Sequence, residues 1–309
     1  MNTIYLSVVI PLYNKASSIV ATVESVLQQQ YPYFELIIIN DGSTDQSLER
    51  LKQIDDKRVR IISQENAGVA HARNTGISMA SYPYIAFLDG DDAWDKLFLS
   101  DIVALIISFP NAGAYSTGYQ YELADNQRKI ATPNFTRKQK ECAVFLYSFF
   151  ETSYAGDLPI QASGCCIPKK VLDHVGVFPV GEAIGEDQDL WARIGLKYPM
   201  AFSQTVRSTY KLNVDDRACV GNIPAKECPF SKRLYRLTKT HNLSPKLRHN
   251  IRKYTANHIL NLVKLNILAG RLDCASKLLH ESRTWLLLPR KIKWSLQLWL
   301  AKFSNAIIH

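Results

Sequence analysis

The chain has 309 residues, of which 47% are hydrophobic and 21% are charged, and its formal net charge is +9. This composition is typical of a globular protein, and it excludes a disordered or low-complexity chain. No apolar stretch reaches the roughly 20 residues that a bilayer-spanning helix needs. No cleavable signal peptide opens the chain, and the six cysteines show no CxxC or zinc-like spacing. We therefore expect a reduced, cytoplasmic protein.

Strand and helix signals alternate through the first hundred residues. The hydrophobic pattern predicts strands at residues 6–10, 35–39, 59–62 and 84–88. It predicts helices from about residue 18 to 30, from 43 towards 54, and from 67 to 80. Ser43 and Gln46 have the spacing of a capping box, which places the start of the second helix. This βαβα order predicts an α/β fold with a mainly parallel central sheet and helices on both of its faces.

The pattern loosens from about residue 111 and changes again after Leu212. The intervening signals predict strands at 113–118 and 161–167, and helices at 137–150, 169–175 and 186–196. After Leu212 only helix signals remain. Residues 1–215 carry 19 Lys and Arg against 24 Asp and Glu, a net charge of −5, whereas residues 216–309 carry 18 against 4, a net charge of +14. We therefore predict an α/β domain over residues 1–215 and a basic helical region over residues 216–309.

Polar motifs follow three of the predicted strands. Pro11-Leu12-Tyr13-Asn14 and Asp41-Gly42-Ser43 follow the first two, and Asp89-Gly90-Asp91-Asp92 follows the fourth. The carboxylates of residues 89–92 have a spacing that suits Mg²⁺ or Mn²⁺, usually with ligand phosphates completing the coordination shell. Taken alone, each motif is an ordinary polar turn. Because ligands of such sheets bind beyond the carboxyl ends of the strands, we expect the three motifs to converge on one binding edge.

Arg73 and the pair Glu186-Asp187 lie on predicted helices. Arg73 would pair with a phosphate or with one of the aspartates, and a solvated helix arginine is the alternative. An acidic pair at a helix N-terminus is common, because it interacts favourably with the helix dipole. Asp187 also follows a glycine-containing loop, and a carboxylate delivered by such a loop would act as a general base on a hydroxyl group.

In this order, five blocks of the sequence resemble glycosyltransferase family 2, whose members have the GT-A fold. The blocks are residues 8–14 (VVIPLYN), 39–45 (INDGSTD), 66–68 with 72–76 (NAG and ARNTG), 87–92 (FLDGDD) and 185–187 (GED). The similarity covers roughly residues 5–212. It implies a nucleotide-diphospho-sugar transferase fold, to which the basic region adds a C-terminal helical extension.

The resemblance implies a role for each motif. The donor would be a nucleotide-sugar, most often a UDP-sugar, and transfer would invert the anomeric carbon. The residues expected to bind the nucleotide-sugar are Pro11, Tyr13, Asp41, Arg73, Asp89 and Gly90. Asp89 and Asp91 occupy the DxD positions, where they would bind Mn²⁺ or Mg²⁺ at the diphosphate. Asp187 would be the general base, with Glu186 as the alternative.

One stretch departs from the pattern of the family. Many members carry a basic residue and a histidine just after the strand that follows the acidic helix, and this chain has no histidine there. Lys211 and Arg217 lie in this stretch, but neither is assigned to the diphosphate. The residues of the acceptor pocket are also not assigned. Two roles are open for one group of residues, which would either line the pocket or close a loop: Asp157, Gln161, Ser163 and Gly164.

The basic C-terminal region is predicted to be helical. Residues 247–280 have the pattern of two packed amphipathic helices with a break at Gly270. From residue 289 on, one apolar stripe lies beside basic residues and contains Ile292, Leu296, Trp299 and Phe303. Two interpretations of residues 289–309 remain open: an interfacial helix on an anionic membrane surface, or a terminal helix docked on its own domain. No DNA- or RNA-binding module is recognisable, so nucleic acid is not an expected partner.

Together with these features, the resemblance implies an inverting, metal-dependent glycosyltransferase in surface polysaccharide or lipid-linked oligosaccharide synthesis. Its acceptor would be a glycan or lipid-linked glycan, and the protein would be cytoplasmic and peripheral on the inner membrane. One alternative is a sugar-1-phosphate nucleotidyltransferase, but the loop after the first strand lacks the glycines of a phosphate-binding loop. The other is a catalytically inactive sugar-nucleotide-binding protein at the membrane surface, against which the intact Asp89, Asp91 and Asp187 argue.

Overall fold

The structure, a computed structural model, describes residues 3–182, 184–212 and 223–308, with side chains up to residue 303. The chain divides into two compact units. Unit 1 comprises residues 1–149, 157–182 and 186–216, and unit 2 comprises residues 150–156, 183–185 and 217–309. The division into separate domains over residues 1–215 and 216–309 stays a prediction.

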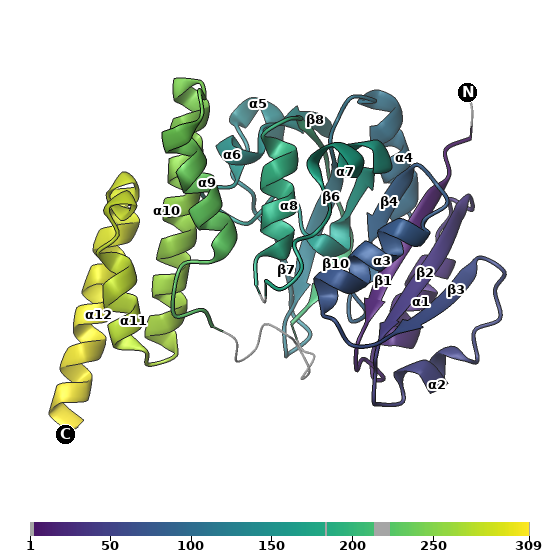
Figure 1. The fold of residues 1–309 in the computed structure, drawn as a ribbon, viewed down its shortest axis with the longest axis horizontal. Coiled ribbons are helices and arrows are strands. Elements are labelled where there is room, and N and C mark those ends of the chain that lie inside the picture. The colour runs from purple at the N-terminus through teal and green to yellow at the C-terminus, as the bar shows by residue number, and fades with distance from the viewer. Residues whose placement is uncertain (1–2, 183, 213–222, 309) are drawn as a thin grey trace. The chain divides into compact units, whose positions relative to one another are not determined.

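Within the described part of unit 1, ten strands form one sheet (Figure 1). They are β1 (Leu6–Leu12), β2 (Phe34–Asp41), β3 (Val59–Gln64), β4 (Tyr84–Phe87), β5 (Ala93–Trp94), β6 (Tyr115–Glu122), β7 (Arg128–Ile130), β8 (Val144–Tyr147), β9 (Cys165–Pro168) and β10 (Met200–Lys211). The order along the sheet is β3-β2-β1-β4-β9-β6-β10-β5, with β7 beside β6 and β8 beside β10. The longest pairings, among β3, β2 and β1 and between β6 and β10, are parallel, whereas β9 runs antiparallel to β4 and β6. The predicted α/β fold with a mainly parallel sheet is confirmed.

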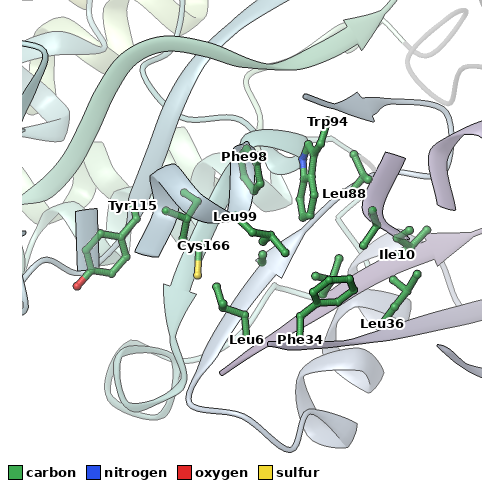
Figure 2. Packing of buried hydrophobic residues seen from close by; sticks show 14 of the residues in the cluster. Leu6, Ile10, Phe34, Leu36, Leu88, Trp94, Phe98, Leu99, Tyr115 and Cys166 are labelled. Carbon is green, nitrogen blue, oxygen red and sulfur yellow. The ribbon is translucent and has the colours of Figure 1, made fainter. Parts of the chain in front are cut away.

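Side chains of β1 alternate between the two faces of the sheet. Leu6, Val8 and Ile10 belong to one buried cluster with residues of α1 (Ile19–Leu27) and α4 (Phe98–Ser108) (Figure 2). On the other face, α3 (Val69–Met79) lies so close that a Cβ atom at Gly76 would come within 2.3 Å of the Val9 side chain. Helices therefore cover both faces beside β1, and glycine is needed where α3 approaches it.

Unit 1 contains further helical segments, most of them short. They are α2 (Ser47–Leu51), α5 (Arg137–Lys140), η1, a 3₁₀ turn (Ala162–Gly164), α7 (Lys169–Val175) and α8 (Glu186–Gly195), while α6 (Phe149–Thr152) begins at the boundary of unit 1. The prediction of one helix over residues 137–150 is wrong, because this stretch contains α5, β8 and the start of α6. β8 pairs antiparallel with β10, and its side chains alternate between exposed and buried positions. Strand pairing therefore overrides the local helical signal.

The predicted capping box at Ser43 is also wrong. α2 begins at Ser47, whose N–H donates to Asp45 Oδ1 at 2.9 Å. The Ser43 hydroxyl instead accepts a hydrogen bond from the Asn14 N–H at 3.1 Å. The polar residues after β2 are thus used to join β2 to the end of β1, which places two of the sequence motifs side by side.

The described part of unit 2 is mainly helical. Its longer segments are α9 (Pro229–Thr240), α10 (Pro245–Leu268), α11 (Leu272–Leu279), the 3₁₀ helix η2 (Ser282–Leu287) and α12 (Leu288–Ile308) (Figure 1). Ser244 caps α10 by accepting the Leu247 N–H, and Gly270, at φ +70°, lies between α10 and α11 as predicted. Apolar side chains of α10, α11 and α12 form the core of this unit. Among the described helices, none combines the length and the hydropathy that a membrane-spanning helix requires.

Candidate active site

The acidic turn after β4, Asp89-Gly90-Asp91-Asp92, is held by hydroxyl groups from two other segments. The Gly90 carbonyl accepts hydrogen bonds from Ser18 Oγ at 3.0 Å and Thr22 Oγ1 at 3.2 Å, at the start of α1. The Asp89 N–H donates to Ser163 Oγ in η1 at 3.1 Å. A Cβ atom at Gly90 would lie only 3.3 Å from the Pro11 carbonyl oxygen. The turn is therefore fixed against the end of β1, and its carboxylates are positioned by contacts within unit 1.

Arg73, on α3, joins two of the predicted acidic motifs. Its Nη2 lies 2.7 Å from Asp89 Oδ1, and its Nη1 lies 3.0 Å from Glu186 Oε1. The guanidinium also lies over the Phe178 ring, 5.2 Å from the ring centroid, and the residue is 3% exposed. Burial alone would lower the pKa of Arg73, but the carboxylates of Asp89 and Glu186 outweigh it and hold that pKa above its usual value. Of the alternatives for Arg73, pairing with an aspartate is the one observed.

Asp187 follows Glu186 in the first turn of α8. Its Oδ1 accepts a hydrogen bond from the Gln188 N–H at 2.6 Å. Burial, followed by the negative charge of Glu186, raises the pKa of Asp187 to about 7, although Arg73 and the Gln188 N–H act in the opposite direction. The helix dipole alone would have made this carboxylate a weaker base. A pKa near neutrality suits proton transfer at physiological pH.

Asp91 is paired with Lys15, whose Nζ lies 2.8 Å from Asp91 Oδ2. The two side chains are only 15% and 14% exposed. Lys15 contacts Oδ2 of Asp91 and Arg73 contacts Oδ1 of Asp89, so within the described part of the chain these two contacts involve one oxygen of each carboxylate. Among the described residues, no group of three or more His, Cys, Asp or Glu side chains is arranged to hold a metal ion. Mg²⁺ at nucleotide phosphates is commonly bound by one or two carboxylates, with phosphate oxygens and waters completing the shell, so Asp89 and Asp91 fit that arrangement.

Asp92, the third carboxylate of the turn, is fully buried. Its Oδ1 accepts the Lys211 N–H at the end of β10, at 2.9 Å. Burial, followed by the negative charges of Asp91 and Asp89, raises the pKa of Asp92 well above its usual range. Asp92 thus ties the acidic turn to β10, and its raised pKa favours the protonated form.

Asp41, at the end of β2, is directed into the loop before α3. Its Oδ1 accepts the Ala67 N–H at 3.0 Å and its Oδ2 accepts the Gly68 N–H at 2.8 Å. Gln64 Nε2 also donates to Oδ1 at 2.7 Å, and Asp41 is 2% exposed. The carboxylate therefore joins two sequence motifs, residues 39–45 and 66–68. Its predicted contact with the nucleotide stays a prediction.

Pro11 and Tyr13 lie at the end of β1. Pro11 is buried in the strand, whereas Tyr13, just beyond it, is 48% exposed. Asn14 Oδ1 accepts the Thr44 N–H at 2.8 Å, which adds a second link to the loop after β2. The motifs after β1, β2 and β4 therefore meet at one edge of the sheet, while the ligand contacts of Pro11 and Tyr13 stay predictions.

Several residues of this site carry no local signal in the sequence. Ser163 lies 74 positions from Asp89, so spacing along the chain does not reveal that its hydroxyl supports the acidic turn. Its carbonyl also accepts the indole N–H of Trp94 at 2.7 Å, which fixes η1 in turn. Lys15 follows a recognised motif, but only its position beside Asp91 shows its role as a counter-ion. Of the two basic candidates near the end of β10, Lys211 contributes its backbone N–H to Asp92, and Arg217 lies outside the described residues.

Residues 7–168, more than half of the chain, match the family model for Glycosyl transferase family 2. The chain belongs to this family. The predicted family and the predicted enzyme class, a glycosyltransferase, are confirmed at this level.

Curated relatives agree with this assignment over part of their length. An uncharacterized glycosyltransferase of Rickettsia bellii is 33% identical over 197 residues, which cover 61% of this chain and 26% of that protein. Glycosyltransferase GlyA of Streptococcus pneumoniae is 33% identical over 60% of this chain and 22% of its own length. The Escherichia coli protein WfgD, a UDP-Glc:alpha-D-GlcNAc-diphosphoundecaprenol beta-1,3-glucosyltransferase, is 39% identical over 47% of this chain and 58% of its own length. The chain thus matches only about a quarter of the first two relatives and just over half of WfgD.

A solved structure shares the fold. The crystal structure of Staphylococcus aureus TarS residues 1–349 in complex with UDP-GlcNAc superposes with a TM-score of 0.70. The superposition covers 98% of this chain and 92% of the TarS chain, at 16% sequence identity. This similarity confirms the predicted GT-A fold with a C-terminal helical extension.

Proposed function

We propose that this chain transfers a sugar from a UDP-sugar to a hydroxyl group of a glycan, with inversion at the anomeric carbon. The observation that carries the proposal is the cluster in which Arg73 interacts with Asp89, Glu186 and Asp187, and in which the pKa of Asp187 is raised to about 7. Such a cluster, in which carboxylates outnumber the arginine, suits a site that binds a divalent cation beside a diphosphate and accepts a proton. The family match supports the same chemistry over a sugar-1-phosphate nucleotidyltransferase, and TarS, solved with UDP-GlcNAc, supports a UDP-sugar.

The acidic turn would form the donor end of the site. Asp91 and Asp89 would hold Mn²⁺ or Mg²⁺, and the bound cation would offset the negative charge that develops on the leaving diphosphate. Arg73 would hold Asp89 in place, and Gly90, which has no side chain, would let the backbone approach the diphosphate. Nucleobase and ribose would be held by Pro11, Tyr13 and Asp41.

Asp187 would form the acceptor end. Its ionised carboxylate would take the proton of the acceptor hydroxyl as the hydroxyl oxygen attacks the anomeric carbon. The bond from that carbon to the diphosphate oxygen breaks on the opposite side, which inverts the configuration. Because Arg73 already engages Glu186 at 3.0 Å, Asp187 is the better base of the two.

The acceptor would be a glycan or lipid-linked glycan of the cell surface. WfgD, whose name specifies a diphosphoundecaprenol-linked acceptor, supports this class. A lipid-linked acceptor would bring the enzyme to the cytoplasmic face of the inner membrane, where residues 289–309 are the segment expected to contact anionic lipid.

Donor binding can be tested by calorimetric titration with a panel of nucleotide-sugars, with and without Mn²⁺. We expect one UDP-sugar to bind, and its affinity to rise when Mn²⁺ is present. No binding of any nucleotide-sugar under either condition would contradict the proposed function.

The general base can be tested with Asp187→Asn. We expect kcat to fall by roughly 10²- to 10⁴-fold, with donor affinity changed by less than about twofold, because the amide cannot take a proton. In the wild type, kcat should rise with pH through about 7, since the raised pKa keeps Asp187 protonated and inactive at lower pH. Asp189→Asn is the matched control, because Asp189 lies on the same helix but is paired with Arg193 at 2.7 Å. Full turnover in Asp187→Asn together with loss of turnover in Glu186→Gln would instead make Glu186 the base.

A further inference from the structure

Helix α12 has apolar side chains on two opposite faces. On one face, Leu298 is 7% exposed and belongs to the core of unit 2, with Trp294 packed against the same cluster. The stripe singled out in the sequence lies on the other face: Ile292, Leu296, Trp299 and Phe303 are 59%, 55%, 59% and 55% exposed. The two interpretations of this segment are therefore compatible, because the helix docks on its own unit and still presents the stripe.

The exposed apolar surface continues beyond the helix. Trp285, in η2, is 64% exposed, and Leu288, at the start of α12, is 44% exposed. The rings of Trp299 and Phe303 stack at the other end, with centroids 5.7 Å apart. We name this surface the outer stripe, and it consists of Trp285, Leu288, Ile292, Leu296, Trp299 and Phe303. Six large apolar side chains in one row exceed the scattered exposure of a normal surface and indicate an interaction site.

Positive charge borders the outer stripe. Residues 282–309 contain five Lys or Arg and no Asp or Glu. Because each helical residue is rotated by about 100° from the one before it, Lys293 and Lys302 fall on opposite sides of the stripe. Both are exposed. Lys291 is buried by contrast: its Nζ donates to the Leu279 carbonyl and Thr284 Oγ1, so the charge beside the stripe comes from Lys293 and Lys302.

We propose that the outer stripe lies in the interfacial layer of an anionic lipid bilayer. Apolar side chains would enter the boundary between headgroups and acyl chains, and Trp285 and Trp299 are of the residue type that favours this depth. Lys293 and Lys302 would extend along the apolar surface to place their ammonium groups at lipid phosphates. The helix lies on the membrane in this arrangement and does not cross it.

A second copy of the chain is the main competing occupant, and the charges disfavour it. In a two-fold symmetric dimer the same surface patch meets itself. The lysines beside one outer stripe would then meet those beside the other, with no acidic residue from 282–309 to offset them. An anionic lipid surface is complementary to the same pattern.

The proposal can be tested by co-sedimentation of the full chain with vesicles. We expect binding to phosphatidylcholine vesicles that contain phosphatidylglycerol and at least about tenfold weaker partitioning to pure phosphatidylcholine. Ile292→Asn with Leu296→Asn should lower partitioning to the anionic vesicles by about tenfold or more, because two apolar anchors are lost. Lys293→Gln with Lys302→Gln should reduce the preference for anionic vesicles and its sensitivity to salt. Leu268→Asn is the matched control, since Leu268 is 73% exposed in unit 2 but lies outside the stripe.

The membrane contact is independent of the transfer chemistry, so donor binding should be unchanged in all of these variants. Equal sedimentation of the wild type with both vesicle types, or unchanged partitioning of Ile292→Asn with Leu296→Asn, would overturn the proposal. So would a dimer in analytical ultracentrifugation that this double variant dissociates while the wild type fails to bind vesicles.

Discussion

Each unit contains a buried arginine that is paired with acidic side chains. The two clusters differ in how the hydrogen bonds of the arginine are distributed among the carboxylates. In unit 2, Arg283 donates from Nη1 and Nη2 to the two oxygens of Glu227, both at 2.7 Å, and lies 4.0 Å from the Tyr235 ring centroid. In unit 1, Arg73 divides its two bonds between Asp89 and Glu186, which come from different segments. In unit 2 one carboxylate, Glu227, takes both short bonds of the arginine, and Glu281 lies farther away at 3.5 Å. In unit 1 the two short bonds go to two different carboxylates, and Asp187 adds a third negative charge.

The pKa values of the acidic groups follow from this difference. Burial would raise the pKa of Glu227, but hydrogen bonds from Arg283 and Ser231 outweigh it and hold that pKa below its usual range. At Asp187, burial and the charge of Glu186 outweigh Arg73, and the pKa rises to about 7. A closed pair is therefore a structural element, while an incompletely neutralised cluster remains able to bind a cation or a proton.

The largest expected effect comes from removing either arginine. Arg73→Met and Arg283→Met should each lower the free energy of unfolding by about 3–5 kcal/mol, because each leaves buried carboxylates without a partner. Urea unfolding measures this loss. Only Arg73→Met should abolish donor binding in calorimetry under conditions where both variants are folded. Donor binding that survived in Arg73→Met would show that its cluster is as purely structural as that of Arg283.

A smaller effect is expected at Asp92, a buried polar side chain that is hydrogen-bonded to the backbone. Asn266 is the comparable side chain in unit 2. Asn266 is fully buried there, and its Nδ2 donates to the carbonyls of Pro224 and Leu262, at 2.9 Å each. Asp92→Ala should cost about 1–3 kcal/mol of unfolding free energy, because the half-buried Lys211 loses the acceptor of its N–H. Asp92→Asn keeps an acceptor and should cost less.

The same pair of variants has a pH signature. The folded-state pKa of Asp92 is raised, so in the wild type folding takes up a proton once the pH exceeds the unfolded value of 3.8. Wild-type stability from this group therefore falls as pH rises from 3.8 towards the folded pKa, and Asp92→Asn does not share that fall. As the pH rises from 4 towards the folded pKa of Asp92, the difference in unfolding free energy should move in favour of Asp92→Asn. A constant difference between the two proteins would mean that Asp92 is ionised in the fold.

The sequence predicts the fold well where the signal is local. Strand periodicity places β1, β2 and β4, and the polar residues after them mark the edge where they meet. The support of the acidic turn by Ser163 and the bond from Asp92 to Lys211 join segments 74 and 119 positions apart, which no local pattern encodes. The helix prediction for residues 137–150 is wrong for the same reason, because β8 is a strand only through its pairing with β10.

The smallest effect concerns two ion pairs, one in each unit, that differ in how exposed their side chains are. Lys15 and Asp91 are 14% and 15% exposed, whereas Lys246 and Glu151 in unit 2 are 77% and 40% exposed. If Asp91 binds a divalent cation, the Lys15 ammonium competes with that cation for one carboxylate. Lys15→Met should therefore tighten Mn²⁺ binding by about fivefold in the absence of nucleotide. The decrease of the electron paramagnetic resonance signal of free Mn²⁺ measures this binding. Lys246→Met removes the same charge from an exposed pair and should leave Mn²⁺ affinity unchanged. Equal Mn²⁺ affinity in the wild type and both variants would remove Lys15 as the counter-ion that a metal replaces, and would weaken the assignment of Asp91 to the cation.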